Sequence, residues 1–247
     1  MLVDVHAHVT SEQFAVDRDA MLARHKDMLI IENGLNPENN LEVLALAKKY
    51  PQVKASLGIY PKHTVEFSPA QFDEQLKFME KQKDHIVAIG EIGLDLQELP
   101  SLDIQQERFI QQVKLAQKLH KPVIVHSRKA EKETVETLAS IGYKKVVMHC
   151  FCGNMKLVKM VEDFGWSITI PALVVTSSHF KAVADRVSIN QLLTETDSPY
   201  LNPVKNERNE PRNVLLAIKK IAEIKKLDVD EVEKNVFMNA QRLFLVQ

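Results

Sequence analysis

Eight short apolar segments recur along the chain, and their spacing limits the possible folds more than any other feature of the sequence. Several are runs of β-branched residues, such as Val123-Ile124-Val125, as expected for strands that are buried on both faces. The predicted strands cover residues 2–7, 28–32, 53–58, 86–90, 123–126, 145–149, 166–170 and 192–196. Strands of this kind belong to a parallel sheet that is covered by helices.

Longer segments with helical apolar spacing separate these strands. The predicted helices cover residues 41–49, 69–82, 103–119, 131–141, 156–164, 212–224 and 229–244. The alternation predicts an α/β fold, a (β/α)8 TIM barrel, and the length of 247 residues suits one barrel domain spanning residues 1–247. A doubly wound open sheet is the rival fold. It is disfavoured because the chain has only 7 glycines and no glycine-rich phosphate loop after any predicted strand.

The formal net charge of the chain is -1, so any site for a polyanion must be local. No apolar run approaches the ~18 residues of a membrane span, and no membrane partner is expected. The first residues carry Asp4 and His6 where a signal peptide would need apolar side chains. The two cysteines, Cys150 and Cys152, indicate no disulfide framework, so we expect a cytoplasmic protein.

Metal-binding side chains gather where the predicted strands end. His6 and His8 are two residues apart on the first strand and therefore project to the same side. The carboxyl ends of all barrel strands open onto one face, so residues distant in sequence can meet there. The predicted divalent-metal ligands, for Mg²⁺, Zn²⁺ or Mn²⁺, are His6, His8, Glu91, His126, His149 and Asp197. Taken singly, a histidine at a strand end such as His126 or His149 is more often a hydrogen-bonded core residue, and the metal prediction depends on their combination with the first strand.

The two carboxylates in this ligand set, Glu91 and Asp197, also have predicted catalytic roles. Glu91 follows an apolar strand, where an unpaired carboxylate is costly to bury, so we predict that it bridges two ions. Asp197 is predicted to bind one ion and to accept a proton from the attacking water. Glu195 shares its strand side, either as a further metal or water contact or as a buried salt-bridge partner, and the sequence leaves both open.

Together these residues resemble those of the TatD family of metal-dependent DNases, which are amidohydrolase-like barrels. The resemblance runs almost from end to end, and residues 105–119 also look like the helix that precedes the fifth strand in that family. The segments that carry it are Asp4-Val5-His6-Ala7-His8, Gly90-Glu91-Ile92-Gly93-Leu94-Asp95, Val125-His126-Ser127-Arg128, His149-Cys150-Phe151 and Glu195-Thr196-Asp197-Ser198-Pro199-Tyr200.

The resemblance implies hydrolysis of DNA, often from an end, by two divalent ions in each subunit. It implies that one ion is held by His6, His8, Glu91 and Asp197, and the other by Glu91, His126 and His149. One segment departs from the family pattern. The family commonly has Gly-x-His-Pro after the third strand, where this chain has Gly58-Ile59-Tyr60-Pro61. Tyr60 therefore stands in place of the histidine, and His63 is an alternative contact to the substrate.

The predicted substrate contacts are Arg128, His63, Tyr60 and Tyr200. Arg128 can grip a phosphate through two hydrogen bonds, whereas Tyr200 could either stack on a base or pack the loop. Further basic residues in loops after strands are Lys62, Lys129, Lys205, Arg208 and Arg212.

The expected substrate is a nucleic acid, specifically DNA. A hydrolase of another ester or amide, such as an aminoacyl ester, a lactone or a phosphotriester, could use the same centre. A metal-binding scaffold without activity is a third hypothesis, which the presence of Asp197 disfavours. The sequence leaves the oligomeric state open.

Overall fold

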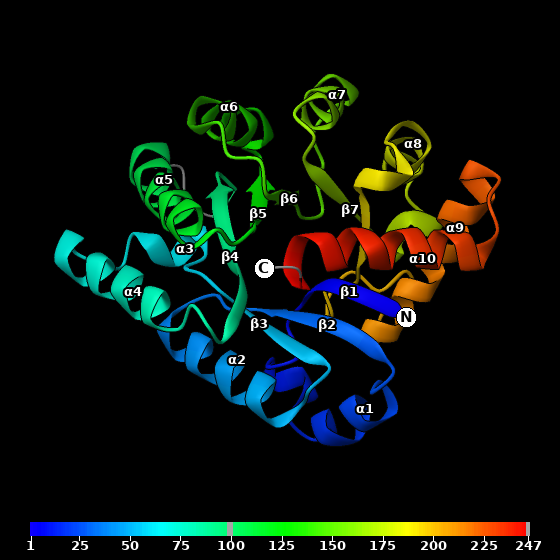
Figure 1. The fold of residues 1–247 in the computed structure, drawn as a ribbon, viewed down its shortest axis with the longest axis horizontal. Helices are drawn as coiled ribbons and strands as arrows, with labels where there is room; N and C mark the ends of the chain where they lie inside the picture. Colours follow the sequence, from blue (N-terminus) through cyan, green and yellow to red (C-terminus); the bar gives the residue numbers. More distant parts are fainter. Residues whose placement is uncertain (98–100, 246–247) are drawn as a thin grey trace.

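Eight parallel strands lie side by side in chain order around a barrel, with helices on its outside (Figure 1). The computed structural model describes residues 1–97 and 101–245. The strands are β1 (Leu2–Ala7), β2 (Met28–Asn33), β3 (Val53–Leu57), β4 (Ile86–Asp95), β5 (Val123–Arg128), β6 (Val146–Met148), β7 (Ser167–Pro171) and β8 (Leu192–Glu195). This arrangement confirms the predicted TIM barrel.

Hydrogen bonds between the first and last strands close the ring. The Asp197 amide donates to the His6 carbonyl at 2.9 Å, and the His8 amide donates to the Ser198 carbonyl at 2.8 Å. Further down the strands, the Thr194 hydroxyl donates to a β1 carbonyl at 2.6 Å. These bonds bring the carboxyl ends of β1 and β8 together at one edge of the barrel.

The helices that surround the barrel are α1 (Arg18–Arg24), α2 (Pro37–Lys49), α3 (Pro61–Thr64), α4 (Pro69–Lys81), α5 (Leu102–Leu119), α6 (Glu131–Ile141), α7 (Met155–Asp163), α8 (Ser178–Arg186), α9 (Val214–Lys225) and α10 (Val229–Ala240). The prediction missed α1, α3 and α8, and it began α2 four residues late. Asn36 caps α2 by accepting from the Asn39 amide, and Pro37 occupies its first turn. Among the described residues, no helix is both long and apolar enough to span a membrane.

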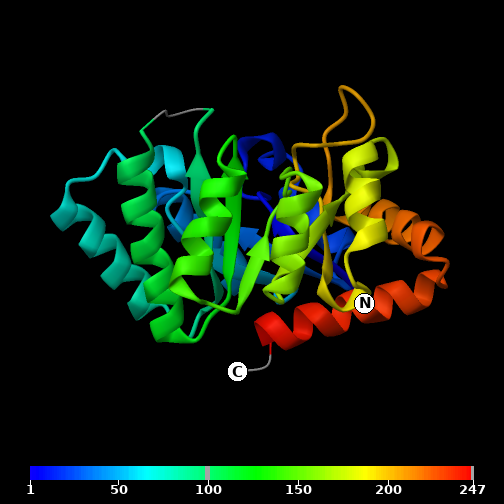
Figure 2. The same ribbon diagram turned by 90° about the horizontal axis from the view of Figure 1, so that it is seen from above.

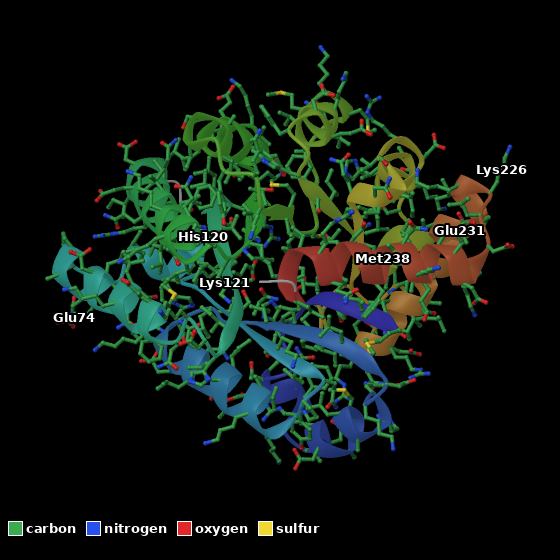
Figure 3. The ribbon with its side chains drawn as sticks, in the orientation of Figure 1. Glu74, His120, Lys121, Lys226, Glu231 and Met238 are labelled. Atoms are coloured by element: carbon green, nitrogen blue, oxygen red, sulfur yellow. The ribbon has the colours of Figure 1, made fainter. Side chains whose placement is uncertain are left out.

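Helix α10 lies across the amino-terminal mouth of the barrel (Figures 1 and 2). Its Asn239 amide donates to the carbonyls of Ile189 and Leu192, at the start of β8. Figure 3 views this end of the molecule, with His120 and Lys121 at the turn before β5 and Met238 on α10. The loops that follow the strands, including residues 199–211, lie at the opposite end (Figure 2).

Strand β4 is longer than predicted. It was expected to end at Gly90, but its pairing with β5 continues to Asp95, opposite Arg128. Glu91 therefore lies within a strand rather than after one. The extension depends on Gly93, which pairs with His126 and has a φ of 146°. A Cβ atom at Gly93 would lie 2.0 Å from the His126 carbonyl oxygen, so only glycine fits there.

We expect Gly93→Ala to lower the free energy of unfolding by about 2–4 kcal/mol, because it combines an unfavourable φ with a steric clash. Urea denaturation measures this loss. Gly142→Ala is the matched control: its φ of 72° is also positive, but an added Cβ would meet nothing within 4 Å. The control should lose only about 1 kcal/mol. Equal losses in the two variants would show that the contact with β5 is unimportant.

Candidate metal centre

Strands β1, β4 and β8 bring one group of four ligands together. His6 and His8 project to the same side of β1, and their Nε2 atoms lie 3.1 Å apart. Asp197 Oδ1 lies 3.6 Å from His6 Nε2 and 3.4 Å from His8 Nε2. Glu91 Oε2 lies 3.4 and 3.5 Å from the same two nitrogens. The structure therefore assembles His6, His8, Glu91 and Asp197, as the sequence predicted.

The other oxygen of Glu91 faces a second group of ligands. Glu91 Oε1 lies 2.9 Å from His126 Nδ1 and 3.9 Å from His149 Nε2. The ligand atoms of Glu91, His126 and His149 all lie within 4.8 Å of one another. Glu91 is buried, and each of its two oxygens faces a different pair of imidazoles. This is the geometry that a carboxylate needs to bridge two ions.

Divalent ions fit this set of donors. A tetrahedral ion with bonds of about 2.0–2.1 Å has ligand atoms about 3.3–3.4 Å apart. The donor separations measured in the first group range from 3.1 to 3.6 Å. Imidazole nitrogens mixed with carboxylate oxygens suit Zn²⁺ or Mn²⁺, and the carboxylates also suit Mg²⁺. The second group is more open, but its donors are of the same kinds.

Buried carboxylates behind the centre orient its ligands. Glu195 Oε2 lies 2.8 Å from His149 Nδ1, which leaves His149 Nε2 to face Glu91. The other Glu195 oxygen accepts from the Cys150 amide at 3.0 Å. The sequence left two roles open for Glu195, and its position fits both: it is a buried partner of His149, and with His6 and His149 it forms a group that could hold an ion. Glu195 Oε2 is the oxygen that contacts His149 Nδ1, and one ligand atom from each of His6, His149 and Glu195 lies within 4.8 Å of the other two.

Charge balance at the centre favours ionised carboxylates. Burial raises the pKa of Glu91 and of Asp197, but the surrounding imidazoles outweigh this and hold both pKa values below their ordinary range. Burial lowers the pKa of His6, and the adjacent His149 lowers it further, so His6 is a neutral ligand. Burial also acts on His149, yet the carboxylate of Glu195 raises its pKa to about 9.

Five of the six candidate ligands, all except His6, line a pocket of about 770 Å³ at the carboxyl end of the barrel. All four predicted substrate contacts, Arg128, His63, Tyr60 and Tyr200, line this pocket. Tyr200 is 51% exposed, with its ring centroid 6.4 Å from that of His8. His63 is paired with Glu66 through Nδ1 at 2.9 Å. The structure therefore places all four residues in the same pocket as the candidate metal ligands.

Two of the basic loop residues lie elsewhere. The Arg208 guanidinium forms two hydrogen bonds of 2.7 Å with the Asp17 carboxylate. Arg212 pairs with Asp27 at 3.1 Å. Both arginines line a separate, shallower pocket, so they are wrong candidates for a contact at the metal centre.

Asp95 is a site residue to which the sequence analysis assigned no role. It is fully buried, and its Oδ2 lies 3.1 Å from His126 Nε2 and 2.8 Å from the Tyr60 hydroxyl. A signal was present, because Asp95 is four residues after Glu91 and side chains at even spacing share one face of a strand. The predicted strand ended at Gly90, so Asp95 was not placed on the same strand face as Glu91.

We expect His6→Ala to abolish most metal binding, because it removes a nitrogen donor from the tighter group of ligands. Metal content after dialysis, measured by elemental analysis, reports the loss. His85→Ala is the control, since His85 is exposed at the turn before β4. Full metal content in His6→Ala would contradict the proposed ligand set.

Metal binding should also release protons. Ligands bind metal only when deprotonated, and His149, with its pKa of about 9, is charged at neutral pH in the metal-free protein. Zn²⁺ affinity should therefore rise with pH until the pKa of His149 is passed. Calorimetry at about pH 7 in buffers of different ionisation enthalpy measures the released protons. A heat of binding that is independent of the buffer would contradict this expectation.

Comparison with known proteins agrees with the fold and identifies the family. Residues 3–245 match the model of the family described as TatD related DNase. An uncharacterised metal-dependent hydrolase from Methanocaldococcus jannaschii is 35% identical, covering 98% of this chain and 96% of the relative. A human deoxyribonuclease, TATDN3, is 31% identical, covering 98% and 94%. The crystal structure of a TatD homologue from Escherichia coli, 28% identical, superimposes with a TM-score of 0.89 over 100% of this chain and 98% of the homologue. This chain is therefore a member of the TatD-related DNase family of metal-dependent hydrolases.

Proposed function

We propose that this protein is a deoxyribonuclease that hydrolyses phosphodiester bonds with two divalent ions. The observation that carries the proposal is the position of Glu91, whose two oxygens face two separate groups of histidines. When bound, two ions would polarise the phosphoryl group, lower the pKa of the attacking water and stabilise the leaving oxygen. The proposed ligands are His6, His8, Glu91 and Asp197 for one ion and Glu91, His126 and His149 for the other.

Asp197 is the proposed proton acceptor. Its side chain is 17% exposed, compared with 3% for Glu91, and it lines the pocket. The neighbouring imidazoles keep its pKa low, so it is ionised at neutral pH and can take a proton from water. Its backbone is held to β1 by the hydrogen bond from its amide to His6. Asp197 therefore reaches the solvent side of the centre from a rigid position.

A phosphate-bearing substrate is supported by the basic side of the pocket. Arg128, Lys62 and His63 line it beside the metal ligands, although the chain as a whole has a net charge of -1. Arg128 is exposed and can form two hydrogen bonds with one phosphate, and the exposed ring of Tyr200 can stack on a base. DNA is the proposed nucleic acid because the human relative is named a deoxyribonuclease. Cys150 and Cys152 are free, which fits a reducing compartment, and we propose the cytoplasm. We also propose that residues 1–247 form one domain.

We expect Asp197→Asn to reduce kcat on single-stranded DNA at least ~100-fold while retaining metal, because the amide cannot accept the proton. Hydrolysis of a labelled oligonucleotide with Mg²⁺, Mn²⁺ or Zn²⁺, with and without chelator, is the measurement. Elemental analysis of the variant separates loss of the base from loss of metal. Unchanged turnover would overturn the role of Asp197. Rapid chelator-sensitive hydrolysis of lactones or aminoacyl esters, with DNA left intact, would favour the other class of hydrolase.

Arg128→Ala should raise KM for DNA about 10-fold, with a smaller effect on kcat, since it removes a charge-assisted grip on phosphate. Arg128→Lys should recover part of the loss, because it keeps the charge without the paired hydrogen bonds. Lys129→Gln, at the next residue, is the control and removes a charge that does not line the pocket. An equal rise in KM for Arg128→Ala and Lys129→Gln would contradict the proposed phosphate contact of Arg128.

A further inference from the structure

The hydroxyl of Tyr60 lies between two residues at the outer edge of the second ligand group. It is 2.8 Å from Asp95 Oδ2 and 3.1 Å from His126 Nε2. The same Asp95 oxygen lies 3.1 Å from His126 Nε2, so the three polar groups form a closed triangle. The rings of Tyr60 and His126 are also in contact, with centroids 4.8 Å apart. His126 is the member that faces Glu91, through Nδ1.

Helix α5 holds both partners of His126 in place. The side chain of Gln112 accepts from the Ile59 amide at 2.8 Å and donates to the Ile59 carbonyl at 3.2 Å, directly before Tyr60. Gln105 makes the same pair of bonds with the backbone of Asp95, at 2.8 and 3.1 Å. Both glutamines are fully buried and are two helical turns apart on one face of α5. The triangle is therefore built on rigid backbone.

The hydrogen bonds of the triangle determine where the His126 ring carries its proton. The Tyr60 hydroxyl donates to Asp95 Oδ2. The phenol oxygen keeps lone pairs that can accept, and Asp95 accepts as well. Nε2 of His126 therefore faces two acceptors and carries the hydrogen, which leaves the lone pair on Nδ1 directed at Glu91. Only this tautomer of neutral His126 can bind an ion through Nδ1.

We propose that Tyr60 is a positioning residue which, together with Asp95, holds His126 in this tautomer and so sets the affinity of the second ion site. This inference rests on the two-ion function proposed above. The contact of Tyr60 with the second ligand group is through His126, so we expect it to act on the ion indirectly. Polar partners behind a ligating histidine typically change metal affinity 10–100-fold when removed.

Tyr60 is also not equivalent to a histidine at this place. A hydroxyl donates and accepts hydrogen bonds through one oxygen, whereas each nitrogen of a neutral imidazole does only one of these. A histidine could donate to Asp95 or accept from His126, but not both through the atom at the apex of the triangle. Tyr60, in the Gly-Ile-Tyr-Pro segment, therefore makes a pair of contacts, with Asp95 and His126, that a histidine could not make through one atom.

The test is calorimetric titration of Zn²⁺ into chelator-stripped protein, comparing wild type, Tyr60→Phe and Tyr60→His. His149→Ala identifies the binding event that belongs to the second group. Tyr60→Phe should weaken that event about 10-fold and leave the other unchanged, because the ring is kept and only the hydroxyl is lost. Tyr60→His should weaken it too. Tyr50→Phe, at the turn before β3 and the far end of the barrel, is the matched control and should match wild type.

Wild-type affinity at the second event in Tyr60→Phe would overturn the inference. An equal loss at both events would overturn it as well, since the effect would then be a general one. If wild-type protein binds a single ion, the two-ion proposal fails, and the role of Tyr60 is decided by NMR of ¹⁵N-histidine-labelled, Zn²⁺-loaded protein. Hydrogen on His126 Nε2 in wild type, and loss of its signal or tautomer in Tyr60→Phe, supports the inference. Identical ring signals in the two proteins refute it.

Discussion

Closure of the barrel between β1 and β8 is the constraint on which the rest of the site depends. The backbone bonds from Asp197 to His6 and from His8 to Ser198 join the carboxyl ends of β1 and β8 at the edge where the candidate ligands lie. The Asp4 carboxylate reinforces this junction by accepting from the amide and the hydroxyl of Thr196. Without closure, His6 and Asp197 would lie at opposite edges of an open sheet, and no single ion could touch both.

The centre concentrates buried charge that the hydrophobic barrel could not tolerate unpaired. Glu91, Asp95 and Glu195 are all buried, and the carboxylate of each lies at hydrogen-bond distance from a histidine nitrogen. Removing one donor would leave a carboxylate without compensation, which costs several kcal/mol in a dry interior. The same contacts that stabilise the buried carboxylates also orient the candidate metal ligands, so stability and function are linked at this site.

Most strands could be predicted because a strand that is buried on both faces has a continuous run of apolar residues. The missed helices are short or irregular: α3 has 4 residues and α1 has 7, too few to show a helical period. The extension of β4 was missed because Glu91 and Asp95 interrupt its apolar pattern with charges. They belong to the strand because Gly93 allows β4 to approach β5 closely at His126. That approach depends on the neighbouring strand and leaves no local signal.

By itself, the sequence determined the alternating strand-helix order and the barrel and indicated six candidate metal ligands, because strand ends and residue types are local properties of the chain. The tertiary structure alone decided how these groups pair: which oxygen of Glu91 faces which histidines, the role of Glu195 behind His149, and the contact of Tyr60 with Asp95 and His126. Tyr60 and His126 are far apart in sequence and meet only when β3 and β5 take their places around the barrel. Hydrogen bonds need distances set to a fraction of an ångström, and residue spacing along the chain carries no such information.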